Sequence, residues 1–593
     1  MKQFFKFTFA SALGFLITFV VTILIIFGII SATLSFTESK TVLVPEGSVL
    51  KMDLSYPIND RGVSQPGFAD FSSLMKKPIG LIDILENIDK AKKDGNIEGI
   101  YLDLTTIQTG LASTQEIRNA LKDFKSSGKF IISYAENYSQ KTYYLASVAD
   151  TVFLHPEGMI DFKGLNAEVM FFKNMLDKVD VEAQVVRHGN FKSAVEPFVM
   201  EKMSQANREQ TSTYINSIWA DMLESISDSR GLSIEKLNRI ADKLTVSNAN
   251  DALKEKFVDN LMYKDEILQF FKNRLNKSEV DDIEMVSLRK YQDAIVEELR
   301  ETFPKNKVAV VFAEGSIQSG EGGNSLTINS DKVSRLIRNV RKDTTIDAIV
   351  FRVNSPGGSA LASDVIWREA KLAAKEKPFI VSMGDLAASG GYYVSCAADS
   401  IFANPTTLTG SIGVFGIIPN MKGLLNNKLG LTFDNVKTNE NSGYISVNRP
   451  LTEYERKVLK NNIEDIYSTF TGKVAEGRGM SVEAVDEIGQ GRVWSGIDAK
   501  QNGLIDEFGG LMAAIDAAAE KAGVEDDYRL IKYPEKKEPL QAFIDELTGR
   551  DKSMAAESVK KELGPLYTYY EYLREIYMME GPQARLPYKV RIY

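Results

Sequence analysis

The longest apolar segment of the chain lies at its N-terminus. No charged residue occurs between Phe7 and Thr37, and the stretch from Phe9 to Ile30 is almost continuously apolar. As a helix it would extend roughly 33 Å at about 1.5 Å per residue, enough to cross a bilayer core of about 30 Å. The apolar region of a cleaved signal peptide is shorter, about 7 to 15 residues, so we expect an uncleaved membrane anchor within residues 1–40. Lys2 and Lys6 precede the run, which predicts a cytoplasmic N-terminus and a chain that lies outside from about residue 40 onward.

Beyond this segment, short apolar runs alternate with amphipathic stretches. In the C-terminal half the apolar runs predict strands at 308–312, 346–353, 378–381 and 401–403, and the stretches between them predict helices at 332–341 and 361–374. Strands separated by helices favour an α/β fold with parallel pairing.

The same pattern occurs twice along the chain. Phe130–Ser133 matches Phe379–Ser382, and Tyr143-Tyr144 matches Tyr392-Tyr393, each 249 residues later. Farther on, the Arg-Gly pair at Arg230 recurs at Arg478 with nearly the same separation. We therefore predict a tandem duplication, with copies at 47–275 and 305–525 joined by a segment of helix and loop at 276–304. A Tyr-rich tail follows at 526–593, with a solvated helix expected over 553–563 and an aromatic stretch over 566–579.

Composition narrows the possible functions. Apolar residues make up 44% and charged residues 25% of the chain, which is ordinary for a folded protein. The net charge of −9 argues against a nucleic-acid partner, because phosphate binding needs a basic face. The single cysteine, Cys396, excludes an intrachain disulfide and a zinc site built from cysteines.

A candidate nucleophile lies in the stretch 383–393, Met-Gly-Asp-Leu-Ala-Ala-Ser-Gly-Gly-Tyr-Tyr. The apolar run before it predicts a buried strand and the segment from Tyr392 to Ala398 predicts a helix, so Ser389 would lie at a strand-to-helix turn. Glycines after the serine let a substrate backbone come close, and a helix start offers free N–H groups to a developing negative charge. An ordinary helix start built from small residues has the same composition, so this stretch alone does not decide between the two.

The two copies differ where this chemistry is expected. Ser389 aligns with Gln140, so the first copy has no hydroxyl at this turn. The loop 354–359, Asn-Ser-Pro-Gly-Gly-Ser, aligns with 105–110, which lacks the Pro-Gly-Gly turn that would expose backbone N–H groups. Because both features are missing together, we expect only the second copy to carry a nucleophile.

Lys192 shows the opposite difference, since it aligns with Asn441 or Ser442 in the second copy. A neutral lysine amine can take the serine proton during attack and return it to the leaving group. Its pKa must then fall well below the reference of about 10.4, and burial among apolar neighbours such as Phe191 and Phe198 can supply this. Most lysines lie on the surface, and the comparison of the copies is what distinguishes this one. It suggests a Ser/Lys dyad split across the duplication.

Two alternatives stay open from the residues alone. The chain has only two histidines, and a histidine-based serine hydrolase must use one of them. His188 lies four residues before Lys192 and could serve as the base, whereas His155 lies beside a proline and is expected to be structural. A non-catalytic membrane scaffold would explain the anchor and the duplication as features of assembly.

Four motifs, in this order, resemble the signal peptide peptidase A (protease IV) family in its long, duplicated bacterial form. They are Phe191-Lys-Ser-Ala-Val-Glu-Pro-Phe198, Asn354-Ser-Pro-Gly-Gly-Ser359, the stretch from Gly384 to Tyr393, and Leu408-Thr-Gly-Ser-Ile-Gly-Val-Phe-Gly416. The resemblance covers about 47–525 and the N-terminal anchor, and leaves the tail without a recognisable motif. It implies a fold related to the Clp protease and crotonase families.

By motif position, the resemblance implies a serine endopeptidase with an acyl-enzyme mechanism, in which Ser389 is the nucleophile and Lys192 the general base. It also implies an oxyanion hole formed by the backbone N–H groups of Gly357, Gly358 and Gly390. Ser411 matches a family serine whose hydroxyl orients the lysine. Such chemistry needs no metal ion and no organic cofactor.

The resemblance also implies substrates and surroundings. Similar proteins assemble as a bowl of four protomers over the membrane and degrade cleaved signal peptides that remain in the bilayer. We therefore expect a single-pass protein of the bacterial cytoplasmic (inner) membrane, with most of its chain on the periplasmic side. Its expected partners are signal peptides and other apolar peptides, membrane lipid around the N-terminal helix, and three further copies of itself in a homotetramer.

Overall fold

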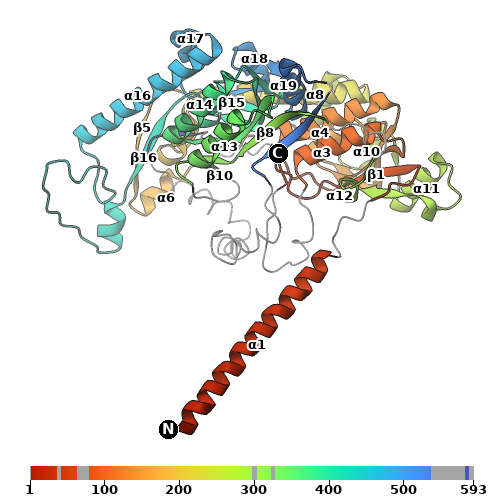
Figure 1. Ribbon diagram of the computed structural model, residues 1–593. Coiled ribbons are helices and arrows are strands. Elements are labelled where there is room, and N and C mark those ends of the chain that lie inside the picture. Colours follow the sequence, from red (N-terminus) through yellow and green to blue (C-terminus); the bar gives the residue numbers. More distant parts are fainter. Residues whose placement is uncertain are drawn as a thin grey trace.

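The computed structural model describes residues 2–35, 42–62, 79–296, 304–321, 327–525, 527–535 and 581–585. An arched body of helices and sheets carries one long helix, α1 (Lys2–Ser35), that projects away from it (Figure 1). The helix and the aromatic stretch expected in the tail, at 553–563 and 566–579, lie outside the described residues.

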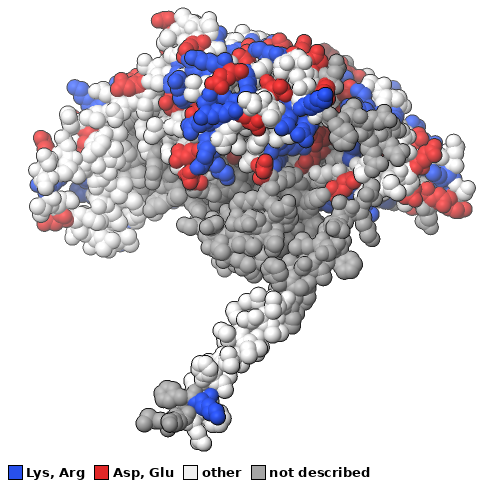
Figure 2. All heavy atoms as spheres, viewed as in Figure 1, with Lys and Arg blue, Asp and Glu red and all other residues white. Residues whose placement is uncertain are grey.

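Helix α1 contains the apolar segment of the sequence. Its window Lys6–Leu24 has a mean hydropathy of 2.2, and none of that window is buried against the body. Figure 2 shows the described part of the helix as an almost uncharged shaft, in contrast to the mixed charges of the body. The helix is therefore long and apolar enough to cross a membrane, a test that an N-terminal signal sequence also passes.

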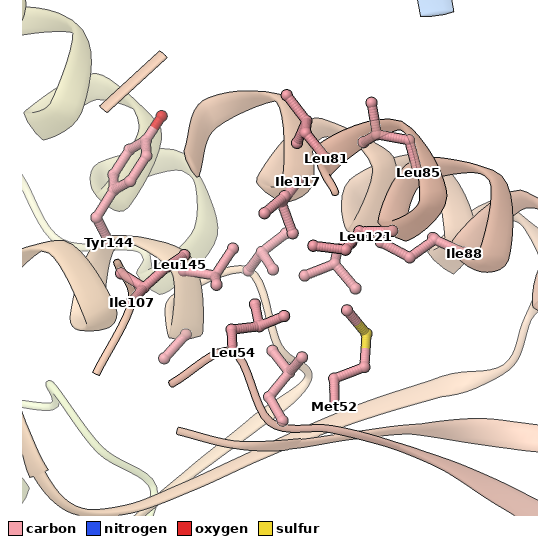
Figure 3. Packing of buried hydrophobic residues seen from close by; sticks show 14 of the residues in the cluster. Met52, Leu54, Leu81, Leu85, Ile88, Ile107, Ile117, Leu121, Tyr144 and Leu145 are labelled. Carbon is pink, nitrogen blue, oxygen red and sulfur yellow. The ribbon is translucent and has the colours of Figure 1, made fainter. Parts of the chain in front are cut away.

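The first copy forms a six-stranded, all-parallel sheet in the order β6-β4-β3-β2-β1-β7. Its strands are β1 (Ser48–Met52), β2 (Ile97–Asp103), β3 (Phe130–Tyr138), β4 (Thr151–Ile160), β6 (Asn260–Leu261) and β7 (Met285–Ser287). Figure 3 shows its core, where Met52 faces Ile88 of α3 (Leu81–Lys93) and Leu121 of α4 (Leu111–Phe124). Strand β7 lies in the segment expected to be helix and loop and extends the sheet instead, because it pairs with β1.

The second copy forms an eight-stranded sheet in the order β17-β15-β13-β11-β8-β19, in which β14 also pairs with β13, and β18 with β14. Its strands are β8 (Asn306–Glu314), β11 (Ala348–Ser355), β13 (Phe379–Ala388), β14 (Ser400–Ala403), β15 (Leu408–Gly410), β17 (Val493–Ser495), β18 (Glu507–Phe508) and β19 (Tyr528–Tyr533). All pairs are parallel except β15 with β17. The four strands predicted in this copy are present, and β19, beyond residue 525, pairs with β8.

A third sheet combines both copies and the tail, in the order β10-β9-β12-β20-β16-β5. Its strands are β5 (Glu182–Arg187), β9 (Ser316–Gln318), β10 (Thr327–Asn329), β12 (Gly357–Ser359), β16 (Phe415–Asn420) and β20 (Gln583–Arg585). Strand β5 of the first copy pairs antiparallel with β16 of the second. This sheet therefore brings the segment after β5 to the second copy.

The remaining described helices cover the sheets and connect them. They are α5 (Gln140–Ala146), α6 (Lys173–Lys178), α7 (Glu196–Val199), α8 (Gln205–Arg230), α9 (Ile234–Lys243), α10 (Ala249–Lys254), α11 (Lys264–Arg274), α12 (Leu288–Tyr291), α13 (Ser330–Lys342), α14 (Ala360–Ala374), α15 (Gly390–Ser395), α16 (Glu453–Arg478), α17 (Val482–Ile488), α18 (Gly496–Gln501) and α19 (Leu511–Ala522), with short helical turns η1 (Lys125–Ser127), η2 (Ser193–Val195), η3 (Val280–Asp282) and η5 (Leu424–Lys428). The helices predicted at 332–341 and 361–374 are present as α13 and α14.

The two copies pack into one body. Along β8, Val308 and Val310 lie in the core shared with the first copy, whereas Ala309 and Val311 face the core of the second, as alternation along a strand requires. Between the copies, the fully buried Arg352 of β11 places its Nη2 2.7 Å from Asp60 Oδ1 and 2.7 Å from Glu116 Oε1. The position of each copy relative to the other is thus fixed by apolar packing and by buried charges.

Candidate active site

Ser389 lies at the turn between β13 and α15 and is fully buried. Its φ of +56° and ψ of −111° are unusual for a residue other than glycine, and two backbone hydrogen bonds hold it there. Its N–H donates to Gly410 O at 2.8 Å, and its carbonyl accepts from Tyr393 N at 2.8 Å. Helix α15 begins directly after the serine, at Gly390, and ends at Ser395, so it starts two residues earlier and ends three residues earlier than the predicted 392–398.

Lys192 of the first copy reaches this turn from the loop that follows β5. It is also fully buried, and its Nζ lies 2.8 Å from Ser389 Oγ, in the same chain. The same Nζ donates to the carbonyl oxygen of Ser411 at 3.0 Å and to Ser411 Oγ at 3.0 Å. The three side chains that the sequence suggested, from segments up to 219 residues apart, therefore meet at one point.

Burial lowers the pKa of the Lys192 amine well below its usual value. The three oxygens around Nζ also suit a neutral amine, which has two N–H donors and one lone pair. The two N–H groups can stay on the carbonyl and hydroxyl of Ser411 while the lone pair accepts the proton of the Ser389 hydroxyl. In the part of the chain that the structure describes, no cluster of three or more His, Cys, Asp and Glu side chains could hold a metal ion.

Residues that sequence reasoning missed hold the lysine loop in place. Gly491, with φ +84°, packs so tightly that a Cβ there would lie 2.6 Å from the backbone of Lys192. Gln210 of α8 donates to Phe191 O at 3.0 Å and accepts from Val493 N at 3.0 Å, so it ties the lysine loop to β17. The one feature of the sequence that could have indicated this contact is the glycine-containing stretch 489–492. Its importance cannot be inferred without the knowledge that Lys192, distant in the sequence, packs against it.

Ser411 is fixed by the same loop. It adopts φ +50°, its N–H donates to Arg492 O at 2.6 Å, and its Oγ donates to Gly491 O at 3.3 Å. These bonds aim both of its oxygens at Lys192 Nζ. The geometry suits the orienting role expected for this serine.

Two of the three glycines expected in an oxyanion hole, Gly357 and Gly390, adjoin the serine turn, whereas Gly358 packs against Ile317 of β9. Gly390 opens α15, where the first N–H groups of a helix have no intrahelical acceptor. Gly357 has φ +95°, and a Cβ on it would lie 2.7 Å from the backbone N of Gly390. A Cβ on Gly358 would lie 2.0 Å from the carbonyl oxygen of Ile317, so neither position has room for a side chain. The Gly357 N–H itself donates to Ser355 Oγ at 3.1 Å, so this amide is engaged within its own loop.

The two histidines make other contacts. His188 Nδ1 lies 2.6 Å from Glu464 Oε2, and its ring stacks on Tyr467 of α16 with centroids 3.7 Å apart. His155 accepts from Glu157 N at 3.1 Å and packs edge-on against Tyr263. This geometry favours Lys192 over His188 as the group that takes the serine proton.

The equivalent turn of the first copy is filled by an amide. Gln140 Oε1 accepts from Lys163 N at 3.0 Å and from Gly164 N at 2.9 Å, and Gln140 Nε2 donates to Gly164 O at 3.1 Å. Gly164 aligns with Gly413, whose carbonyl oxygen lies 3.5 Å from Ser389 Oγ in the second copy. The glutamine thus closes the degenerate turn by bonding to the segment that the serine approaches.

Comparison with known proteins gives one family twice. The model of Peptidase family S49 matches residues 123–278 and 371–525, once in each copy. Protease 4 of Salmonella typhi is 38% identical over 82% of this chain and 78% of its own, and the chloroplastic serine protease SPPA of Arabidopsis thaliana is 33% identical over 92% and 78%. A solved structure of a mutant ClpP1 from Listeria monocytogenes aligns with 35% of this chain and 94% of its own at 18% identity, with a TM-score of 0.24. The predicted tandem α/β duplication is confirmed.

Proposed function

Because this chain belongs to peptidase family S49, a family of serine peptidases, we propose that it is a membrane-anchored endopeptidase with Ser389 as nucleophile and Lys192 as general base. One observation carries the proposal: the Lys192 amine and the Ser389 hydroxyl, both fully buried, lie 2.8 Å apart. A lysine that is buried, has a lowered pKa and lies beside a serine fits the role of a base.

The proposed reaction uses only groups of this chain. Lys192 Nζ takes the hydroxyl proton as Ser389 Oγ attacks the carbonyl carbon of the peptide. The negative charge that develops on the carbonyl oxygen is stabilised by backbone N–H groups. The N–H of Gly390, directly after the nucleophile at the start of α15, is the first proposed donor, and those of Gly357 and Gly358 are the other two. The lysine then gives its proton to the leaving amine, which breaks the C–N bond and leaves an ester on Ser389. Water, deprotonated by the same lysine, hydrolyses the ester and restores both residues.

The proposed substrates are remnants of cleaved signal peptides and other apolar peptides in the cytoplasmic membrane. Helix α1 supports an anchored protein, and Lys6 at its start supports an orientation with the body outside the cytoplasm. In this arrangement the catalytic body lies at the membrane surface where such peptides remain. We also propose a homotetramer, which mass photometry of the full chain in detergent tests directly; a monomer at working concentration would contradict it.

The dyad is tested with two variants and a matched control. Ser389→Ala and Lys192→Met should each lower the cleavage rate of a fluorogenic apolar peptide by at least about 10³-fold. Gln140→Ala changes the equivalent turn of the first copy and should leave the rate nearly unchanged. Loss of activity in His188→Ala together with full activity in Lys192→Met would overturn the lysine assignment in favour of the histidine alternative.

The scaffold alternative needs a separate measurement. A fluorophosphonate probe reacts with an activated serine, and it should label the wild-type chain but not Ser389→Ala. Absence of labelling in folded, assembled protein would favour a non-catalytic scaffold.

A further inference from the structure

Helix α16 lies along β5 and faces the first residue of the lysine loop (Figure 1). This residue, His188, stacks its ring on that of Tyr467 with centroids 3.7 Å apart and places its Nδ1 2.6 Å from Glu464 Oε2. Tyr467 and Glu464 are three positions apart and therefore lie on the same face of the helix. The N–H of His188 donates to Val414 O at 3.0 Å. His188 is thus held both by α16 and by the segment between β15 and β16.

The hydroxyl of the same tyrosine reaches a second segment that contacts the lysine loop. Tyr467 Oη accepts from Gln490 N at 3.1 Å. The carbonyl of Gln490 in turn accepts from Phe191 N at 3.0 Å, and the next residue, Gly491, packs against the backbone of the lysine. Tyr467 therefore connects the first residue of the lysine loop with the turn that supports its last residues.

The first copy uses the aligned aromatic residue differently. Helix α8 corresponds to α16, since each has 26 residues and ends at an Arg-Gly pair. Tyr467 aligns with Trp219, whose Nε1 donates to Asn238 Oδ1 of α9 at 3.0 Å. The ring of Trp219 thus serves packing within the first copy. A hydroxyl that holds Gln490 belongs only to the copy with the candidate nucleophile.

We propose that Tyr467 and His188 are positioning residues, which clamp the lysine loop so that Lys192 Nζ stays beside Ser389 Oγ. This inference rests on the proposed function and adds two residues to it. Their contacts described above are with the loop and its supporting turn, so they act on the reaction through the backbone. The clamp maintains the distance of 2.8 Å between the two reacting groups. It also keeps the amine buried, and burial is what lowers the pKa of Lys192.

The first test removes only the tyrosine hydroxyl. Tyr467→Phe keeps the ring that stacks on His188 and should lower kcat for a fluorogenic apolar peptide about tenfold at unchanged KM, because a small displacement of a reacting group slows the reaction. Water would reach the loosened amine, so the pKa of Lys192 should move up toward its usual value. The rise of kcat/KM with pH should therefore shift to higher pH. A loss of stability alone would not shift this profile.

The second test removes the stacked ring. His188→Ala should lower kcat about tenfold and shift the pH profile in the same direction. His188→Phe restores the stack without a titratable nitrogen and should recover most of the lost kcat, a result that a base at this position would not give. Because the His188 side chain is 26% exposed, these variants keep the test open if changes at Tyr467 prevent folding.

The matched control is Trp219→Phe, which removes the donor at the aligned position of α8 and should leave kcat and the pH profile unchanged. Wild-type kcat with an unshifted profile in either Tyr467→Phe or His188→Ala would overturn the clamp, while Ser389-dependent cleavage by the wild-type chain would still support the proposed function. Absence of Ser389-dependent cleavage in the wild-type chain is the separate result that would overturn the proposed function.

Discussion

Replacement of Gly491 by alanine should slow hydrolysis about a hundredfold in a folded protein. The new Cβ would lie 2.6 Å from the backbone N and Cα of Lys192, and backbone atoms cannot rotate away from it. Since carbon atoms pack at about 3.5 to 4.0 Å, the two segments must separate by about 1 Å. The Lys192 amine lies 2.8 Å from Ser389 Oγ, so a shift of this size takes it out of hydrogen-bonding range. A misplacement of about 1 Å at a reacting group can cost about 10²-fold in rate.

The assay compares kcat for a fluorogenic apolar peptide and needs a control for backbone strain. Gly491 has φ +84°, and alanine pays about 1–2 kcal/mol in this left-handed region. Gly503 has φ +75° and no atom within 4 Å of a Cβ, so Gly503→Ala carries the strain without the collision. Both variants should lower Tm, Gly491→Ala by more because the collision adds to the strain, but only Gly491→Ala should lose activity. Wild-type kcat in Gly491→Ala, or an equal loss in Gly503→Ala, would refute the placement of the lysine by this loop.

Two further measurements test the surroundings of Lys192, and a third tests the buried charges between the copies. Ser411→Ala removes an acceptor of the Lys192 amine and should lower kcat about 10- to 100-fold with little change in KM. Ser411→Thr keeps a hydroxyl and should restore part of the lost kcat. An unchanged kcat in Ser411→Ala would contradict the orienting role. Burial lowers the pKa of Lys192, and the neutral amine is the proposed base. The value of kcat/KM should therefore rise with pH and level off well below pH 10.5. A kcat/KM that falls over this range would contradict the lysine mechanism. Arg352→Met leaves Asp60 and Glu116 buried without their cation, so it should lower the free energy of unfolding by about 3–5 kcal/mol and lower Tm relative to wild type. An unchanged Tm would show that this buried charge cluster does not stabilise the fold.

The parts of the fold that the sequence predicted are those with a local apolar pattern. The run at 378–381 identified β13, but the strand continues to Ala388. Its extension includes Asp385, a partly buried carboxylate that accepts from Ser113 N and Ser113 Oγ of the other copy. A charged residue inside a buried strand interrupts the pattern, and only the distant partner explains it. Strand β20 gave no signal, because its residues are Gln-Ala-Arg and it is held by backbone pairing.

The proposed pair of the candidate site could be selected from the sequence because the chain contains its own comparison. Ser389 and Lys192 were identified as the chemically active residues that one copy has and the other lacks. Gly491 and Gln210 could not be found in this way, since their importance lies in a contact with the lysine loop that forms only in the folded chain. Whether the role of each residue is the one proposed is decided by the variants above.

The split of the site across the duplication follows from how the copies pack. The lysine segment of the first copy passes from β5 into the second copy, because β5 pairs with β16, and this delivers Lys192 to the serine turn. The corresponding segment of the second copy, 435–448, pairs with no strand among the described residues and lies largely exposed, with Val436 fully so. A serine at position 140 would therefore not meet a lysine from this segment, so the first turn could lose its hydroxyl without loss of a base–nucleophile pair of this kind. The glutamine that replaced it makes three hydrogen bonds to Lys163 and Gly164, which suits a turn retained for structure alone.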